Sequence, residues 1–198
     1  MFTDDHPYIN DAYEEAKEAV EKFVSNSLKI DVPPPEAKKY REAVKNKVYT
    51  SHYHGENEVK ENERLAKFIT SHIDTTIWLL PRLNSNNQND IKLRKELLPP
   101  GVFDRKNPDF YIGGLFFDGK SMLNVEKTDD VVTQKQQIEN RIKKAKEQAD
   151  NIVLEIPEWI ELGTIAKTVN NYLNRSSKER IILVCWNKRL LKFTGGKK

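Results

Sequence analysis

Apolar side chains recur three or four positions apart in several stretches of the chain. This spacing places them on one side of a helix, so each stretch predicts a helix with one buried face. In the stretch 133–150, for example, Ile138, Ile142 and Ala145 form the apolar stripe. The predicted helices span residues 8–28, 36–48, 58–72, 91–97, 133–150 and 158–173.

Short runs rich in β-branched and aromatic residues lie between these helices and predict strands. Prolines bound some of these runs, and Gly113-Gly114 and Asn187-Lys188 each predict a tight hairpin turn. The predicted strands span residues 75–80, 109–112, 115–121, 152–156, 180–186 and 189–193. Strands mixed with covering helices predict an α/β or α+β fold, with a mixed sheet, flanking helices and a C-terminal hairpin.

A proline-rich segment divides the chain near its N-terminus. Val-Pro-Pro-Pro at 32–35 stops the first predicted helix and forms a stiff, extended link to the second. These two helices therefore look separate from the alternating helices and strands that follow. We expect an N-terminal helical element over residues 1–50 and a second domain over residues 51–198.

The composition limits the kinds of function to consider. The chain has 198 residues, of which 37% are hydrophobic and 32% charged, which suits a soluble protein with a modest core. No stretch approaches the roughly 18 apolar residues of a membrane span, and the acidic N-terminus has no apolar signal core. We therefore expect a cytoplasmic protein. Its net charge is only +3, so any nucleic-acid site requires local clustering of basic residues.

The hairpin predicted over residues 109–121 carries three ionisable groups in an otherwise apolar setting. Alternation along its second strand puts Phe116, Asp118 and Lys120 on one face. Asp109 lies near the start of the first strand, roughly opposite Lys120 or its neighbours. If the turn is tight, the two carboxylates and the ammonium gather within a few ångströms.

This grouping is suited to hydrolysis of a phosphodiester bond. Two carboxylates on a rigid sheet can hold a divalent metal, which activates water and neutralises charge on a phosphate. A lysine beside them can position the water or stabilise the transition state. Glu63, on the preceding helix, is the candidate third carboxylate, with Glu58 as the alternative. Exposed carboxylate–lysine pairs are also common on ordinary hairpins, so the residue types alone leave both interpretations open.

Over residues 58–156 the chain resembles the PD-(D/E)xK nuclease core. The resemblance rests on the predicted order helix, three strands, helix, strand, together with Pro108-Asp109 and Asp118-Gly119-Lys120. More narrowly, the run from KNPDF through FFDGKS to QIENRIKKAKEQADNIVLEI is similar to the C-terminal toxin domains of contact-dependent growth-inhibition proteins. One departure is that the nuclease family more often has Glu where this chain has Asp118, whose shorter side chain would shift the metal.

The resemblance implies a toxin-like nuclease, with RNA, and specifically transfer RNA, as a more favoured substrate than DNA. It implies that Asp109 and Asp118 are metal ligands, that Lys120 is the catalytic lysine and that Glu63 is the helix carboxylate. The implied cofactor is a divalent metal, Mg²⁺ before Mn²⁺ or Zn²⁺. A cognate immunity protein is an implied partner, and the place of action is the cytoplasm of a bacterial cell.

Basic residues recur in two later segments and support a nucleic-acid partner. Exposed Lys and Arg side chains neutralise phosphates, although a charged helix face is also an ordinary solvated surface. Aromatic side chains near the site can stack on bases, and Phe110 or Tyr111 is the candidate. The candidate nucleic-acid-binding residues are Lys135, Arg141 and Lys144 on the helix, with neighbours Lys143 and Lys146, and Lys188 and Arg189 on the final hairpin, with neighbour Lys192.

Two other functions stay open at this point. His52, His54 and His72 are compatible with a metal-independent ribonuclease, in which His, Glu and Lys perform acid–base chemistry. The His-x-His spacing is also compatible with zinc, although no complete ligand set is visible. A non-catalytic module that binds nucleic acid or protein is the third interpretation. Chelation of metals separates the two catalytic functions, and the third predicts no cleavage.

Overall fold

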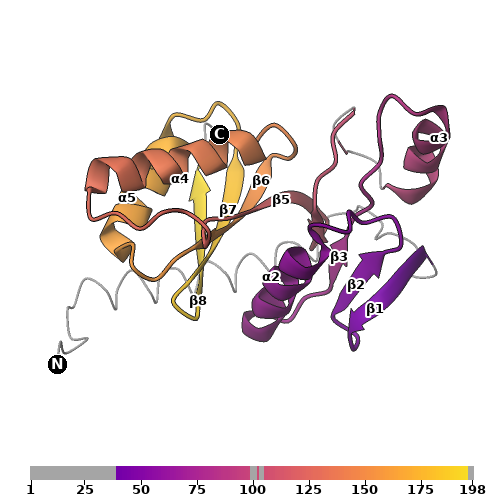
Figure 1. Cartoon of the computed structure of the whole chain (residues 1–198), viewed down its shortest axis with the longest axis horizontal. Helices are drawn as coiled ribbons and strands as arrows, with labels where there is room; N and C mark the ends of the chain where they lie inside the picture. The colour runs from indigo at the N-terminus through magenta and orange to yellow at the C-terminus, as the bar shows by residue number, and fades with distance from the viewer. Residues whose placement is uncertain (1–38, 99–101, 103–104, 196–198) are drawn as a thin grey trace.

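The computed structural model describes residues 39–98, 102 and 105–195. In this part of the chain, eight strands form one mixed sheet, and the strands follow one another across it in chain order (Figure 1). The strands are β1 (Tyr40–Val44), β2 (Val48–Ser51), β3 (Ile77–Leu79), β4 (Phe110–Ile112), β5 (Leu115–Ser121), β6 (Asn151–Ile156), β7 (Arg180–Trp186) and β8 (Arg189–Gly195). The helices are α2 (Val59–His72), α3 (Gln88–Leu97), α4 (Val131–Ala145) and α5 (Leu162–Asn174).

Helices connect the parallel neighbours of the sheet, and short turns connect the antiparallel pairs β1–β2, β4–β5 and β7–β8. β2 and β3 are parallel and joined through α2, while β5, β6 and β7 are parallel and joined through α4 and α5. β4 and β5 form an antiparallel hairpin in which Gly113 and Gly114 have positive φ values of 54° and 84°. Only glycine adopts such values without steric cost, so this pair sets the hairpin.

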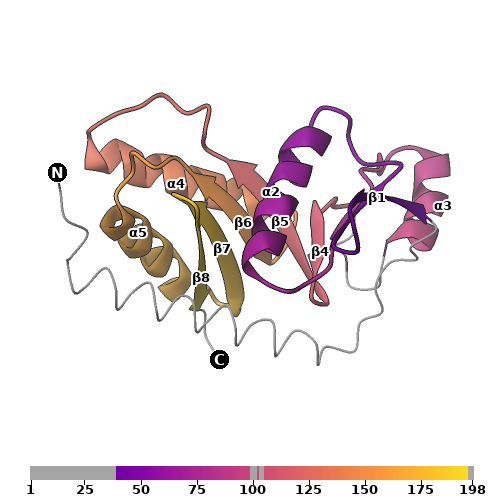
Figure 2. The ribbon, with the colours of Figure 1, turned by 90° about the horizontal axis from the view of Figure 1, so that it is seen from below.

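The two faces of the sheet are covered by different helices. Leu65 and Ile69 of α2 pack with Phe110, Phe117 and the side chains of β6 and β7 that point the same way. α4 and α5 pack on the other face through Ile138, Ile142, Ile165 and Val169. α4 and α5 therefore lie beside β6–β8, whereas α2 lies near β2 and β3 (Figures 1 and 2).

A small aromatic cluster completes the second face, at the end of the sheet that α4 and α5 do not cover. Tyr40, Trp78 and Tyr111 are buried there, and Phe116 packs against them. Tyr49 stacks on Trp78 with the ring centroids 4.5 Å apart. Along β5, the residue pattern therefore changes from aromatic packing at Phe116 to charged groups at Asp118 and Lys120.

The fold class expected from the sequence is confirmed, because the described residues form a mixed sheet flanked by helices. The order helix, three strands, helix, strand is also confirmed, with α3 between the first and second of those strands. Most predicted elements are displaced by only a few residues. The largest shift is at α4, which ends at Ala145, while Ala149 is buried in the turn that follows.

The predicted helix over residues 36–48 is wrong for the residues that the structure describes. Tyr40–Val44 and Val48–Ser51 form an antiparallel pair of strands, and Asn46 occupies their turn with φ 57°. Local spacing suggested a helix, but pairing of β2 with β3 satisfies the strand backbone and buries Val48 in the core. The predicted helix over residues 8–28 lies outside the described residues, and the division into domains at residue 50 stays a prediction.

No described helix combines the length and apolar character that crossing a membrane requires.

Candidate functional site

The strand register of the β4–β5 hairpin brings the two aspartates together. Phe110 pairs with Phe117, and Tyr111 pairs with Phe116, so the next residues outward are Asp109 and Asp118. Directly opposed residues of an antiparallel pair project from the same face of the sheet. The Oδ2 atom of Asp109 accepts a hydrogen bond of 2.8 Å from the backbone N–H of Gly119, which ties the first carboxylate to the second strand.

Lys120 joins the two aspartates from the same strand. Its ammonium donates a hydrogen bond to the Asp118 carboxylate and another, of 2.9 Å, to the carbonyl oxygen of Gly119. The structure thus brings Asp109, Asp118 and Lys120 into one cavity of about 110 Å³. The lining residues are His54, Glu58, Leu80, Pro81, Arg82, Asn107, Pro108, Asp109, Asp118, Lys120 and Gln148.

Burial makes the two carboxylates costly to ionise together. Removal from water raises the pKa of Asp109, against the opposing effects of Lys120 and of the Gly119 N–H. Burial, followed by repulsion from Asp109, raises the pKa of Asp118 to about 8, although Lys120 lowers it. Three carboxylates, those of Asp109, Asp118 and Glu58, line the cavity with only two cationic side chains, those of Lys120 and Arg82. A cation that enters the cavity would therefore be held favourably.

The third predicted carboxylate, Glu63, lies outside this cavity. It accepts a hydrogen bond of 2.7 Å from the Thr50 hydroxyl and forms an ion pair with Arg41. This position follows from the helix, because α2 covers the face of the sheet that carries Phe117 rather than the face of Asp118. Glu58 directly precedes α2 and does line the cavity. Its negative charge contributes to raising the pKa of Asp109.

Arg82 is a residue that the sequence did not single out. It follows Pro81 at the end of β3, where its backbone N–H donates a 2.9 Å hydrogen bond to the Tyr53 carbonyl. Its guanidinium forms an ion pair with Glu58, and the cavity lining includes both. Glu58, and then Asp109 and Asp118, raise the pKa of Arg82. The sequence signal was weak, since an arginine after a strand has many ordinary roles.

Asn107 and Gln148 hold the segment that leads into Asp109. The Asn107 side-chain oxygen accepts hydrogen bonds from Leu83 N–H at 3.1 Å and from Arg94 at 2.8 Å. The Asn107 backbone N–H donates to Gln148 Oε1 at 3.2 Å. These bonds tie the approach to β4 both to the loop after β3 and to the turn after α4. Asp109 is therefore positioned by three segments that are far apart in the sequence.

His54 lines the cavity, but both of its ring nitrogens are engaged. Nδ1 lies 2.6 Å from the Leu80 carbonyl, and Nε2 lies 3.0 Å from the side-chain amide nitrogen of Asn62. With Nδ1 as the donor to the Leu80 carbonyl, Nε2 can accept a hydrogen bond from the Asn62 amide. His72 stands at the opposite end of α2, about 20 Å along the helix axis from its start. His54 and His72 are therefore not gathered into one acid–base site.

The candidate nucleic-acid-binding residues occupy two separate places. Lys135, Arg141 and Lys144 lie on α4, which covers the same face of the sheet as the aspartates. Lys188 and Arg189 lie at the β7–β8 turn, where the Lys188 carbonyl contacts His72 at the end of α2. Arg189 pairs with Trp186, which packs on the face that α4 and α5 cover, so Arg189 projects from that face as well, at the end of β7.

The aromatic side chains proposed for stacking on a base are enclosed. Phe110 is fully buried against α2, and Tyr111 is only 3% exposed within the aromatic cluster. Their neighbour across the hairpin, Phe116, is partly exposed instead.

The donor atoms at the site suit a hard cation. In the described part of the chain, no cluster of three or more His, Cys, Asp or Glu side chains is arranged to hold a metal. The Lys120 ammonium nevertheless already lies between the Asp118 carboxylate and the Gly119 carbonyl, so oxygen atoms converge on a positive charge there. Two carboxylates and a carbonyl are ligands that fit Mg²⁺ or Mn²⁺ better than Zn²⁺.

Comparison with known proteins gives one match. No curated protein and no solved structure matches the chain. Residues 106–188, fewer than half of the 198 residues, match the family described as the contact-dependent growth inhibition CdiA C-terminal domain. The matched segment contains Asp109, Asp118 and Lys120 but begins after Glu58 and Arg82. Over this segment, the chain is similar to the C-terminal toxin domains of contact-dependent growth-inhibition proteins.

Proposed function

We propose that this protein is a toxin-like, metal-dependent nuclease that hydrolyses phosphodiester bonds. The observation that carries the proposal is the pair of buried carboxylates, Asp109 and Asp118, which share one cavity and one sheet face with Lys120. A buried pair of carboxylates that Lys120 balances only in part favours the binding of a further cation. Perturbed ionisable groups in a cleft are characteristic of functional sites.

The proposed roles follow from chemistry and position. Asp109 and Asp118 supply the carboxylate ligands for a divalent cation, with Mg²⁺ favoured by the oxygen-only donors. When bound, the cation supplies an activated water and charge neutralisation at the scissile phosphate. Lys120 exchanges its contact with Asp118 for a water or a phosphate oxygen and stabilises the developing charge. Glu58, rather than Glu63, is the carboxylate that completes the site.

Arg82 has a binding role in this proposal. Its guanidinium is paired with Glu58 at the edge of the cavity, and its side chain is 56% exposed. An arginine presents paired N–H donors that match two phosphate oxygens. Arg82 therefore holds the phosphate of the incoming strand, while Lys120 acts at the reacting atoms.

RNA, with transfer RNA foremost, is the proposed substrate class, and this choice rests on the similarity to toxin domains rather than on the geometry. The same similarity supports a cognate immunity protein as partner. The engagement of both His54 nitrogens favours the metal-dependent reaction over a histidine-based one.

A cleavage assay with metal control tests the proposal. Total RNA and plasmid DNA are incubated with the purified protein in Mg²⁺ and, separately, in EDTA. We expect cleavage in Mg²⁺, none in EDTA, and a loss of at least about 100-fold in Lys120→Ala, because a charge that stabilises the transition state is removed. Lys67→Ala, an exposed lysine of α2, is the matched control and should cleave like the wild type. Cleavage that persists in EDTA would exclude this reaction.

A further inference from the structure

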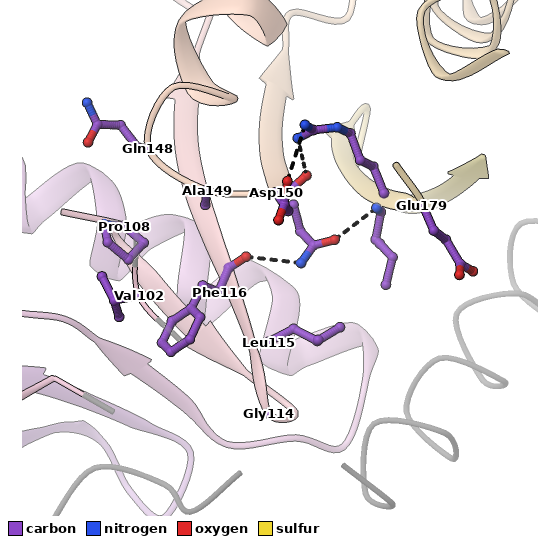
Figure 3. Close-up of a pocket in the computed structure, with 12 residues that line it drawn as sticks. Val102, Pro108, Gly114, Leu115, Phe116, Gln148, Ala149, Asp150 and Glu179 are labelled. Atoms are coloured by element: carbon purple, nitrogen blue, oxygen red, sulfur yellow. Dashed lines mark hydrogen bonds and ion pairs between the residues drawn. The ribbon is translucent and has the colours of Figure 1, made fainter. Parts of the chain in front are cut away.

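A second and larger cavity adjoins the aspartate site. Its volume is about 440 Å³, within the range of about 300–1,000 Å³ that small-molecule sites have. Pro108 and Gln148 line both cavities, so the two are neighbours across one short boundary. It lies where β5, β6 and β7 begin (Figure 3). The lining residues are Val102, Pro108, Gly114, Leu115, Phe116, Gln148, Ala149, Asp150, Asn151, Glu179, Arg180 and Ile181.

One part of this cavity is apolar and aromatic. Leu115 and Phe116 of β5 line it together with Ile181 of β7, and all three are only partly buried. Figure 3 shows Phe116 between Leu115 and Val102, with Pro108 close by. The accessible part of the Phe116 ring offers an aromatic surface on which a nucleobase can stack.

The other part of the cavity is charged, with the carboxylates of Asp150 and Glu179 beside the Arg180 guanidinium. Asp150 and Glu179 are both in the lining, and Glu179 is exposed. The Oδ1 atom of Asp150 lies 3.2 Å from an Arg180 nitrogen and 3.6 Å from the Lys178 ammonium. This oxygen is nevertheless buried and accepts no hydrogen bond from the described residues. Carboxylates repel a phosphate, but they accept hydrogen bonds from the N–H groups of a base.

The separation of Phe116 in the larger cavity from Asp118 in the aspartate cavity suits one nucleotide. Phe116 and Asp118 are two residues apart on β5 and project from the same face of the sheet. At the rise of an extended strand, that separation is about 6–7 Å. A phosphate beside Asp118 can therefore be attached to a nucleotide whose base lies on Phe116.

We propose that the larger cavity binds the base next to the cleaved phosphate, and that it prefers guanine. Guanine presents two adjacent donors, N1–H and the N2 amino group, to the carboxylate side of the cavity. Its flat ring fits against Phe116. This inference rests on the proposed nuclease function, which it deepens by naming the base that is recognised.

The proposal requires a substrate whose base can leave the stack. A base inside a duplex cannot reach Phe116 without unpairing, which costs a few kcal/mol. Single-stranded RNA, or the loop of a folded RNA, presents the base directly.

The first experiment maps the cut sites and then removes the base. Wild-type protein is incubated in Mg²⁺ with a single-stranded RNA and with its duplex, and the products are sequenced. We expect cuts next to guanine, at least tenfold faster in the single strand. Replacement of that guanine by an abasic residue should lower kcat/KM at least fivefold, because stacking of one base on an aromatic ring is worth that much.

Substitution of the aromatic ring tests whether Phe116 is the stacking residue. Phe116→Leu should cleave the intact RNA at least fivefold more slowly than the wild type and should show no further loss on the abasic RNA. Phe68→Leu, the same change on α2 across the sheet, should retain the wild-type preference for the intact RNA. Equal cleavage of intact and abasic RNA by the wild type would overturn the proposal, as would an equal loss by Phe116→Leu on both substrates.

A binding measurement separates this proposal from the nuclease function. Guanosine 5′-monophosphate is titrated into the wild-type protein without metal, and backbone amide shifts are followed by NMR. We expect shifts at Leu115, Phe116 and Ile181, and weaker ones with uridine 5′-monophosphate. Guanosine binding there without cleavage of any RNA would overturn the nuclease proposal and support the base site. Cleavage of RNA with no shift at these residues would overturn the base site alone.

Discussion

At the level of single residues, β5 has to satisfy two different environments at once. Phe117 is buried beneath α2, whereas Asp118 and Lys120, on either side of Gly119, project into the cavity on the other face. Gly119 also donates its backbone N–H to Asp109 and accepts a hydrogen bond from Lys120 through its carbonyl. The backbone of one glycine thus contacts two of the proposed catalytic residues.

Gly119→Ala should destabilise the fold. A Cβ atom there would lie 2.6 Å from Phe110 Cε2, and Phe110 is fully buried and cannot move aside. Overpacking of this kind costs about 1–3 kcal/mol of unfolding free energy. Urea unfolding measures this loss. Gly163→Ala is the matched control, because a Cβ there meets nothing within 4 Å, so its stability should be unchanged or slightly higher. Wild-type stability in Gly119→Ala would show that the packing at Phe110 adapts.

The choice between the two candidate carboxylates is also tested by single substitutions. Glu58→Gln should lower kcat for RNA cleavage at least about tenfold, because Glu58 lines the aspartate cavity and its charge acts on Asp109. Glu63→Gln should leave kcat nearly unchanged, since Glu63 contacts Thr50 and Arg41. Steady-state kinetics in Mg²⁺ measure both values. The opposite ranking would restore Glu63 as the third carboxylate.

At the level of elements, α2 is fastened to the sheet by a polar contact as well as by its apolar face. The Arg64 guanidinium makes two hydrogen bonds to the Glu155 carboxylate, one of them 2.7 Å long. Ser121, the last residue of β5, donates a 2.6 Å hydrogen bond to the same carboxylate. Because Ser121 directly follows Lys120, this contact links α2, β6 and the end of the site strand.

Arg64→Ala should cost about 1–3 kcal/mol of unfolding free energy, because the buried Glu155 carboxylate loses most of its partners. Arg175→Ala removes a similar ion pair on the surface, that of Arg175 with Glu139 at 3.0 Å, and should cost about 0–1 kcal/mol. Chemical denaturation of the two variants in parallel measures the difference. Equal losses would mean that the contact between α2 and β6 adds no more than an exposed pair.

The β7–β8 hairpin should carry a pH-dependent contribution from Lys192. Burial lowers the pKa of Lys192 to about 8, against an opposing effect of Glu179. In the unfolded chain, a lysine keeps its proton to about pH 10.4, so between these values the unfolded state binds more protons and stability rises with pH. The wild type should therefore gain stability relative to Lys192→Met across this interval. Lys167→Met, at an exposed position of α5, should show a constant difference.

At the level of the whole molecule, the two basic groups differ in their distance from the cavities. Lys144 is one helical turn before Gln148, which lines both cavities. Lys135 precedes Gln148 by 13 residues, which is about 20 Å at the rise of a helix. Lys188 is seven residues beyond Ile181, about 23 Å along an extended strand. We therefore expect RNA bound at the proposed site to meet the end of α4 before the β7–β8 turn.

Lys144→Ala should weaken RNA binding and reduce the salt dependence of the affinity by about one phosphate contact. Lys188→Ala should change neither quantity for a short oligonucleotide centred on the site. Fluorescence anisotropy over a series of salt concentrations, in EDTA to prevent cleavage, measures both. A larger effect of Lys188 would mean that RNA runs toward the β7–β8 turn and not along the end of α4.

The periodicity of apolar residues predicted most of the architecture, because burial of one helix face or one strand leaves a local mark on the sequence. It predicted α2, α4, the β4–β5 hairpin and the positions of Asp118 and Lys120 on one face. It failed at residues 40–48, where strand pairing with a distant segment overrides a local helical pattern.

Tertiary structure alone decided the remainder of the candidate site. The residue types on the hairpin indicated a pair of carboxylates with a lysine. The strand register placed Asp109 opposite Asp118, where Asp109 accepts a hydrogen bond from the Gly119 N–H. Which glutamate lies near the aspartates depends on the face of the sheet that α2 covers. In the folded chain, Glu58 and Arg82 line the aspartate cavity, whereas Glu63 accepts a hydrogen bond from Thr50. Spacing along a chain records which side chains share a local surface, whereas contacts between segments far apart in the sequence exist only once the chain has folded.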